Sequence, residues 1–337
     1  MKRLRGVWRE FAALVLPVAC AGCGRPREPS AVCAECAELL HGGGPGRVRP
    51  SPQPPGLPVV HAAARYEDAP RAVLLAHKER GALGLAGELG RALAGAVRGA
   101  VGEVGAGWGW GGEGGEGEPP GAYPPGSWVS APPVDATQEV VLVPVPSARR
   151  SVAVRGQDPV RRIAFAAAGE LRRGGLVARV APVLRQCRPV GDQAGLTARE
   201  RLANLSGALE AVPGAERLLT GPRAGFEDVF REVPAGSRPG SDAGDAPAGV
   251  RETGPAGAGA GVTVVLVDDL MTTGASLAEA ARALRACRGA YDRRRRRPGR
   301  PGEYLRTSGG RPGNSGFPTI AAAVVAAPPK SFEINWN

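Results

Sequence analysis

The pattern of apolar and polar positions predicts a parallel α/β sheet with helices on both faces. Short runs of Val, Ile, Leu and Ala are separated by longer stretches with helical periodicity, as in strands joined by crossover helices. The runs contain few polar residues, as expected of strands buried on both faces. Strands are predicted at Val59–Ala64, Val140–Val143, Ala178–Leu184, Ala208–Val212, Val262–Val267 and Thr319–Ala327.

Start signals and apolar stripes predict the helices between these strands. Asp68 is the expected N-cap of a helix with Pro70 in its first turn, which runs to Lys78 and is followed by a break at Gly81. Further helices are expected to begin at Leu83, at Asp158-Pro159, at the capping box Thr197–Glu200 and after Ser276.

Glycine and proline divide the chain into ordered and linker segments. With 51 Gly and 33 Pro among 337 residues, we expect one ordered core of about 200 residues. Disordered insertions are predicted at residues 99–137, 221–260 and 289–316, within a domain covering residues 57–330. An N-terminal unit, residues 1–45, precedes this domain, and His41–Gly56 is expected to be linker.

The net charge of +11 is compatible with an acidic partner such as nucleic acid. Much of the excess is arginine in a chain with almost no lysine, and part of it is the run Arg293–Arg297. A bias in composition would produce the same charge. We expect this run to be disordered, and leave open whether it is a solvated tail or touches nucleic acid.

The apolar run Phe11–Ala19 is too short to span a membrane. Arg9 and Glu10 precede its nine residues, and Pro17 interrupts it. This favours a short amphipathic helix over a secretion signal. The protein is therefore expected in the cytoplasm, without a membrane partner.

Four cysteines near the N-terminus have the spacing of a compact zinc site. Cys20 and Cys23 form one C-x-x-C pair, and Cys33 and Cys36 form a second one nine residues later. Disulfide bonds are the alternative, but they are rare in the reducing cytoplasm. Because four thiolates leave no open coordination position, the predicted Zn²⁺ is structural.

The most informative stretch is Val262–Ser276, which joins a buried strand to a helix through an acidic pair and a hydroxyl-rich turn. Asp268 and Asp269 end the predicted strand and are expected to be open to solvent. The carboxylates suit ribose hydroxyls or a hydrated Mg²⁺, whereas backbone N–H groups at the helix N-terminus suit a phosphate. The turn that would hold this phosphate consists of Thr272, Thr273, Gly274, Ala275 and Ser276.

Two alternatives to this interpretation were considered. One is an ordinary strand-to-helix junction, which we consider less consistent with an acidic pair and a Thr-Thr-Gly-Ala-Ser turn on the same buried strand. The other is a P-loop, which requires lysine in the motif G-x-x-x-x-G-K-[ST]. The lysines of the chain are Lys2, Lys78 and Lys330, so a P-loop is excluded.

A second anion-binding loop is predicted after the strand that ends at Val143. Pro144 and Pro146 stop the strand, and the following N–H groups with two guanidinium groups suit a diphosphate. Lys78 is interpreted either as a solvated helix end or as a charge that faces the same diphosphate. The residues predicted to bind this group are Pro146, Ser147, Arg149, Arg150 and Lys78.

The stretch Val262–Ser276 resembles the phosphoribosyl-pyrophosphate (PRPP) signature of the type I phosphoribosyltransferases. The resemblance implies that Asp268 and Asp269 hold the ribose 2- and 3-hydroxyls and that Thr272 to Ser276 hold the 5-phosphate. It also implies that the Val143 loop receives pyrophosphate. Family members that act on 6-oxopurines carry Asp where this chain has Thr272, which argues against hypoxanthine or guanine as the acceptor.

Further residues make the chain similar to the ComF-type phosphoribosyltransferases. The similarity rests on the Cys₄ knuckle, Tyr66-Glu67, Lys78, Pro144-Val-Pro146, Arg155-Gly156, Gln193 to Leu196, Arg201, Asn204 and Val267-Asp-Asp269. Arg155 and Gly156 correspond to a substrate loop. That loop usually reads Arg-Gly-Phe-Asn, so Gln157 and Asp158 are departures from the family pattern.

The resemblance implies a type I phosphoribosyltransferase fold and a Mg²⁺-dependent transfer from PRPP to a nucleobase-like acceptor, with release of pyrophosphate. Asp268 and Asp269 are the implied catalytic residues. The alternative is a non-catalytic protein in competence, the uptake of single-stranded DNA. Neither the acceptor nor the oligomeric state follows from the sequence.

Overall fold

The computed structural model describes residues 19–26, 31–105, 138–191, 193, 195–220, 262–295 and 318–333. Within these ranges the side chains of residues 149, 150, 154, 220 and 290–295 are not described. Most of the predicted insertions and the predicted N-terminal helix lie outside the described residues, as do Arg296 and Arg297.

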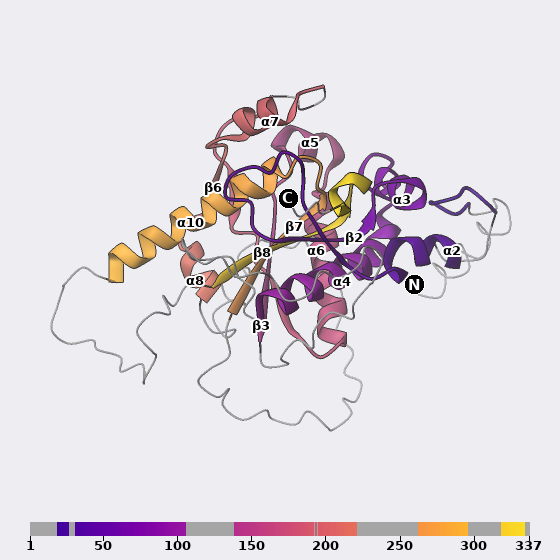
Figure 1. Cartoon of the computed structure of the whole chain (residues 1–337), viewed down its shortest axis with the longest axis horizontal. Coiled ribbons are helices and arrows are strands. Elements are labelled where there is room, and N and C mark those ends of the chain that lie inside the picture. The colour runs from indigo at the N-terminus through magenta and orange to yellow at the C-terminus, as the bar shows by residue number, and fades with distance from the viewer. Residues whose placement is uncertain are drawn as a thin grey trace, which may run out of the picture.

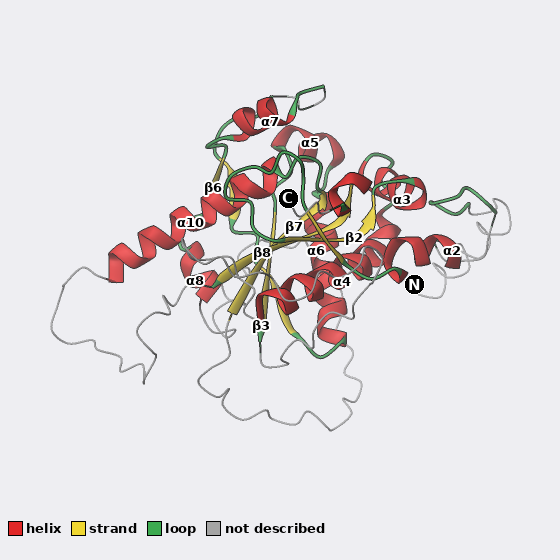
Figure 2. Ribbon diagram, viewed as in Figure 1, coloured by secondary structure: helices red, strands yellow, loops and turns green. Residues whose placement is uncertain are grey.

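A six-stranded, mostly parallel sheet forms the centre of the molecule (Figure 2). Its spatial order is β1-β2-β8-β7-β3-β4, and only β1 runs antiparallel to its neighbour. The six strands are β1 Gly46–Val48, β2 Val60–Arg65, β3 Glu139–Pro144, β4 Val177–Val180, β7 Val262–Leu270 and β8 Thr319–Ala327. A separate antiparallel pair consists of β5 Leu184–Gln186 and β6 Leu209–Ala211.

The predicted strands are largely confirmed, with two corrections. The predicted run Ala178–Leu184 is two strands, β4 and β5, because the chain leaves the main sheet after Val180. The predicted linker His41–Gly56 contains β1, whose Arg47 pairs with His61 of β2. β1 and β5 are short strands at the periphery and have no marked apolar pattern. The sequence therefore did not separate them from their surroundings.

Helices flank the sheet on both sides (Figure 1). None of the described helices combines the length and the apolar character that crossing a membrane requires. Their bounds are α2 Ala34–Ala37, η1 Glu38–Gly42, α3 Asp68–Lys78, η2 Leu83–Leu85, α4 Ala86–Gly105, α5 Arg149–Arg155, α6 Pro159–Arg173, α7 Ala198–Leu205, α8 Ala215–Thr220, α10 Ala275–Arg295 and η4 Pro329–Phe332.

Two helices extend into segments that were predicted to be disordered. α4 continues to Gly105 because its last turns remain anchored: Val101 is buried, and Glu103 forms an ion pair with Arg47 at 2.9 Å. α10 continues to Arg295 and so includes the first residues of the arginine run. Arginine is a good helix former, and no proline follows until Pro298.

The N-cap prediction for α3 is wrong, whereas those for α6 and α7 are confirmed. Glu67, not Asp68, occupies the N-cap position of α3, and Asp68 opens the helix with φ 44°. In α6 the Asp158 carboxylate accepts hydrogen bonds from two backbone N–H groups. In α7 Thr197 and Glu200 form the predicted capping box.

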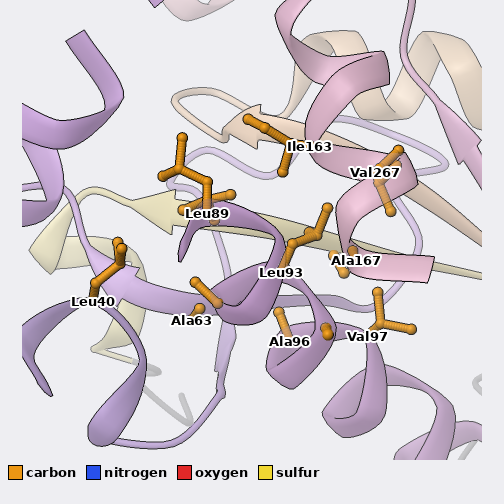
Figure 3. Close-up of a cluster of buried hydrophobic side chains, with 14 of the residues drawn as sticks. Leu40, Ala63, Leu89, Leu93, Ala96, Val97, Ile163, Ala167 and Val267 are labelled. Carbon is orange, nitrogen blue, oxygen red and sulfur yellow. The ribbon is translucent and has the colours of Figure 1, made fainter. Parts of the chain in front are cut away.

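Alternate side chains of the strands point into two different cores. Val265 and Val267 of β7 pack with α4 and α6, whereas Val264 and Leu266 pack with α10. Figure 3 shows the first of these cores, in which Leu89 and Leu93 of α4 lie with Ile163 and Ala167 of α6 and with Val267. The sheet is therefore covered by α4 and α6 on one face and by α10 on the other.

This arrangement brings the carboxyl ends of β3 and β7 side by side at one edge of the sheet. The two strands are parallel neighbours, with Val143 opposite Leu266. The helix α6, which follows β3, lies on one face of the sheet, and α10, which follows β7, lies on the other. Adjacent strands whose connections leave in opposite directions form the place where open α/β sheets bind ligands.

We predict that Gly90→Ala destabilises the protein by about 1–3 kcal/mol through overpacking. A Cβ atom at Gly90 would overlap Ala166 Cβ and lie 2.9 Å from the backbone nitrogen of Ala167, so α4 and α6 would have to separate. Urea unfolding measures the change. Gly95→Ala on the same helix is the control: its Cβ meets nothing within 4 Å, and the better helix propensity should stabilise by up to about 1 kcal/mol. Equal effects of the two substitutions would contradict the close helix contact.

Candidate functional site

The sequence suggested that the acidic pair follows the strand. In the structure the pair lies within β7. β7 continues to Leu270, and Asp268 pairs with Val324 of β8. The expectation that both acids are open to solvent is also wrong. Asp269 is only 4% exposed and Asp268 is half-buried, because β8 and the loops at this edge of the sheet extend beyond them.

The two carboxyl groups of the acidic pair lie within hydrogen-bonding reach of each other. Oδ2 of Asp269 lies 2.8 Å from Nζ of Lys78 at the end of α3. Oδ1 of Asp268 accepts a hydrogen bond from the Asp269 N–H at 2.8 Å. Lys78 is therefore not a solvated helix end but the counter-ion of Asp269.

Burial and the neighbouring charges shift the pKa values of Asp268 and Lys78. Burial raises the pKa of Asp268 well above its usual value, and the Asp269 charge raises it further, while Lys78 opposes both effects. Burial alone would lower the pKa of Lys78, but the attraction of Asp269 and Asp268 outweighs it and raises this pKa. Lys78 thus stays charged beside Asp269, and Asp268 retains a proton more readily than a free carboxyl group.

The turn Thr272 to Ser276 lies directly before α10, as predicted. Gly274 has φ 73°, a left-handed conformation that favours glycine, and its carbonyl accepts a hydrogen bond from Ala278 N–H in the first turn of α10. A Cβ atom at Gly274 would lie 3.1 Å from Leu57 and 3.2 Å from Pro50. The segment that contains these two residues therefore covers one side of the turn.

The loop after β3 has a different hydrogen-bonding pattern from the one predicted. Ser147 Oγ donates to Asp158 Oδ1 at 3.1 Å, so its hydroxyl ties the loop to the N-cap of α6. Arg149 and Arg150 open α5, but their side chains lie outside the described part of the chain. Pro146 is half-buried just beyond the end of β3.

Arg155 brings a second cation close to the acidic pair. It ends α5, and Gly156 follows with φ 70°. The positive charge of Arg155 repels that of Lys78 and acts to lower the pKa of Lys78. Nε of Arg155 and Oε1 of Gln157 are buried without a hydrogen-bond partner among the described residues.

Arg201 brings a third cation to the site, and this contact could not be predicted. Its Nη1 donates to Thr272 Oγ1 at 3.1 Å across 71 residues of sequence. Asn204 on the same helix instead has a structural contact, because its amide exchanges two hydrogen bonds with the backbone of Gly191. No local pattern indicated that α7 would reach the turn before α10.

The predicted cysteine cluster is present. The four Sγ atoms of Cys20, Cys23, Cys33 and Cys36 lie within 4.8 Å of one another, and those of Cys23 and Cys33 are 3.8 Å apart. A tetrahedral Zn²⁺ with Zn–S bonds of about 2.3 Å requires sulfur atoms about 3.8 Å apart. These four cysteines could therefore bind a zinc ion.

The backbone around Cys20 favours its thiolate form. Burial opposes ionisation, but N–H groups of Cys23, Cys33 and Gly22 donate to the sulfur and lower the pKa of Cys20 to about 6. A thiolate is the form that ligates a metal. Cys187 and Cys287 lie elsewhere and line a cavity of about 720 Å³ between β6, α8 and α10.

Comparison of the chain with models of known protein families gives no match, and a search among curated proteins gives none either. The chemistry of the site is therefore inferred from its own residues.

We predict that Asp268→Asn stabilises the protein near neutral pH. Since the folded-state pKa of Asp268 is raised, the stability that its protonated form provides is present below about pH 4 and lost as the pH rises. The Asn variant avoids this loss, so its unfolding free energy should exceed that of the wild type by on the order of 1 kcal/mol at pH 7 and match it near pH 3. Chemical denaturation at both pH values measures this. A lower stability of the variant at pH 7 would contradict the prediction.

We also predict one bound zinc per chain. Cys36→Ser should abolish it and lower the Tm by about 10 °C, since structural zinc sites are coupled to folding. Elemental analysis after reducing, metal-replete purification measures the metal, and a thermal melt measures the stability. Cys187→Ser is the control and should leave both unchanged. Less than half an equivalent of zinc in the wild type would contradict the prediction.

Proposed function

We propose that the protein is a type I phosphoribosyltransferase of the ComF kind, which binds PRPP with Mg²⁺ and transfers its phosphoribosyl group to a nucleobase-like acceptor. The observation that supports this best is the combination of two carboxylates with a glycine turn and a helix N-terminus at the carboxyl end of β7. Carboxylates suit ribose hydroxyls, and the N–H groups of the turn suit a phosphate.

In this proposal, Asp268 and Asp269 bind the ribose. Because the two carboxyl groups lie close together, they can accept hydrogen bonds from the neighbouring 2- and 3-hydroxyls of one ribose. The elevated pKa of Asp268 favours a ligand that donates to it or brings positive charge. The carboxylate oxygens also fit hydrated Mg²⁺, which supplies positive charge to the pyrophosphate when bound.

Lys78 and Arg155 are the described cations placed to bind the pyrophosphate. Lys78 ends α3, which packs with α4 and α6, and Arg155 has unused hydrogen-bonding capacity at Nε. Arg149 and Arg150 at the start of α5 remain candidates through the sequence alone. The N–H groups from Gly274 onward would hold the 5-phosphate at the start of α10.

The reaction proposed is a displacement at C1 of the ribose. A nitrogen of the acceptor forms a bond to C1 while the C1–O bond to pyrophosphate breaks. The electron pair of that bond leaves with the pyrophosphate, and an acceptor nitrogen that carries a proton releases it to water. The residues of this chain contribute by positioning the reactants and by stabilising the negative charge that develops on the leaving group.

A second candidate function is contact with single-stranded nucleic acid, favoured by the outer face of α6. Phe165 is 50% exposed, and the Arg161 guanidinium carbon lies 5.7 Å from the centre of its ring. A shallow cavity of about 530 Å³ beside it is lined in part by Gly169, Arg172 and Arg173. Exposed aromatic rings next to arginines are surfaces on which bases stack. Because this surface has one such ring, it is weaker support for nucleic-acid binding than the acidic site is for PRPP binding.

We predict that replacing Asp268 and Asp269 together with Asn weakens PRPP binding at least about tenfold. Hydrogen bonds to charged groups contribute roughly 1.5–3 kcal/mol each, and the substitution removes the charge of Asp269 and the ability of Asp268 to ionise. Titration calorimetry with PRPP and Mg²⁺ measures the affinity, and circular dichroism checks that the variant, in which Lys78 loses its partner, remains folded.

Glu210→Gln is the matched control for this experiment. It removes a carboxylate that pairs with Arg185 on the surface, away from the acidic pair, and should leave PRPP binding unchanged. Wild-type protein that ignores millimolar PRPP in the presence of Mg²⁺ would overturn the transferase proposal and favour the nucleic-acid candidate.

A further inference from the structure

Arg201 is a cation of the site to which the proposed reaction assigns no role. One of its N–H groups donates to Thr272 Oγ1, but Nε is buried without a hydrogen-bond partner in the described ranges. No carboxylate of the described residues forms an ion pair with it, whereas nearby Arg282 is paired with Glu279 at 2.7 Å. A guanidinium group held in place without an anion is suited to receive one from a ligand.

The position of Arg201 differs from that of the other two cations. Lys78 ends α3, which packs with α4 and α6, and the positive charge of Arg155 repels that of Lys78. Arg201 belongs to α7, which packs against α10 on the opposite face of the sheet (Figure 1). Lys78 and Arg201 therefore reach the site from elements that pack with different faces of the sheet.

This separation matters for a displacement at C1 of a ribose. When one group displaces another at an anomeric carbon, it approaches the face of the sugar opposite to the leaving group. If Lys78 and Arg155 bind the pyrophosphate, the acceptor enters from the side of α7. Arg201 is a described cation on that side and donates a hydrogen bond to the turn before α10.

We propose that Arg201 binds the acceptor and that the acceptor is an anion, carrying a carboxylate or a comparable planar oxyanion on its ring. This inference rests on the proposed phosphoribosyl transfer. Nη1 is anchored to Thr272, so the remaining N–H groups of the guanidinium form the planar fork that binds a carboxylate through two hydrogen bonds. A neutral base would leave the positive charge of Arg201 without a partner.

The competing role for Arg201 is binding of the 5-phosphate. Thr272 is the first residue of the turn that would hold this phosphate, so the guanidinium group could add to the same subsite. The two roles predict different results. If Arg201 binds the 5-phosphate, its replacement lowers the affinity for PRPP. If Arg201 binds the acceptor, its replacement changes the discrimination between charged and neutral acceptors.

The test uses the full chain, saturated with Mg²⁺ and PRPP, and a matched pair of probes. Pyridine-3-carboxylate and pyridine-3-carboxamide share size and ring but differ in charge. Calorimetry and pyrophosphate release should show that the carboxylate binds wild-type protein at least about tenfold more tightly, the effect of a charge-assisted pair. In Arg201→Gln the two probes should bind within about threefold of each other, and PRPP should bind as in the wild type.

Arg199→Gln is the control, since Arg199 is exposed on the same helix and should leave the carboxylate preference intact. If Arg201→Gln does not fold, Thr272→Val provides the second variant: it removes the anchor of the guanidinium and should reduce the preference. Loss of PRPP affinity in Arg201→Gln would assign Arg201 to the 5-phosphate and overturn the inference.

Two outcomes for the wild type separate this inference from the proposed function. Protein that binds PRPP but does not distinguish carboxylate from carboxamide overturns the acceptor inference alone. Protein that does not bind PRPP overturns the proposed function, and the acceptor inference with it.

Discussion

The parallel pairing of β7 between β3 and β8 is the constraint on which the rest of the structure depends. It aligns Val143 with Leu266 and so brings the carboxyl ends of β3 and β7 together. Because β3 connects to β4 on one side and β7 connects to β8 on the other, right-handed crossovers place α6 and α10 on opposite faces of the sheet. The candidate site lies where these two connections diverge.

The charged groups around the acidic pair would suit an anionic ligand. A buried carboxylate requires a partner, and Lys78 provides one for Asp269. Arg155 and Arg201 add positive charge without a described acid of their own, while Asp268 tends to retain a proton. The site therefore contains more positive than negative charge, and the polyanionic PRPP of the proposed function would complete its pairing.

The cysteine cluster contributes indirectly to this site. Cys20 and Cys36 are buried in the same core as α3 and α4, and a Cβ at Gly22 would lie 3.1 Å from Cβ of Ala69 on α3. A metal bound by four thiolates has no open position for catalysis. Its effect would be to stiffen the support of α3, whose last residue is Lys78, and so to hold that ammonium group against Asp269.

The sequence by itself determined the strands of the main sheet except the short β1, as well as the cysteine cluster and the turn before α10, because each depends on residues that are close in the chain. The periodicity of apolar residues and the spacing of cysteines are local signals. Only the tertiary structure decided the burial of Asp269, its pairing with Lys78 and the contact between Arg201 and Thr272. These depend on the packing of α3 and α7 against the sheet, which joins residues far apart in sequence and leaves no local pattern.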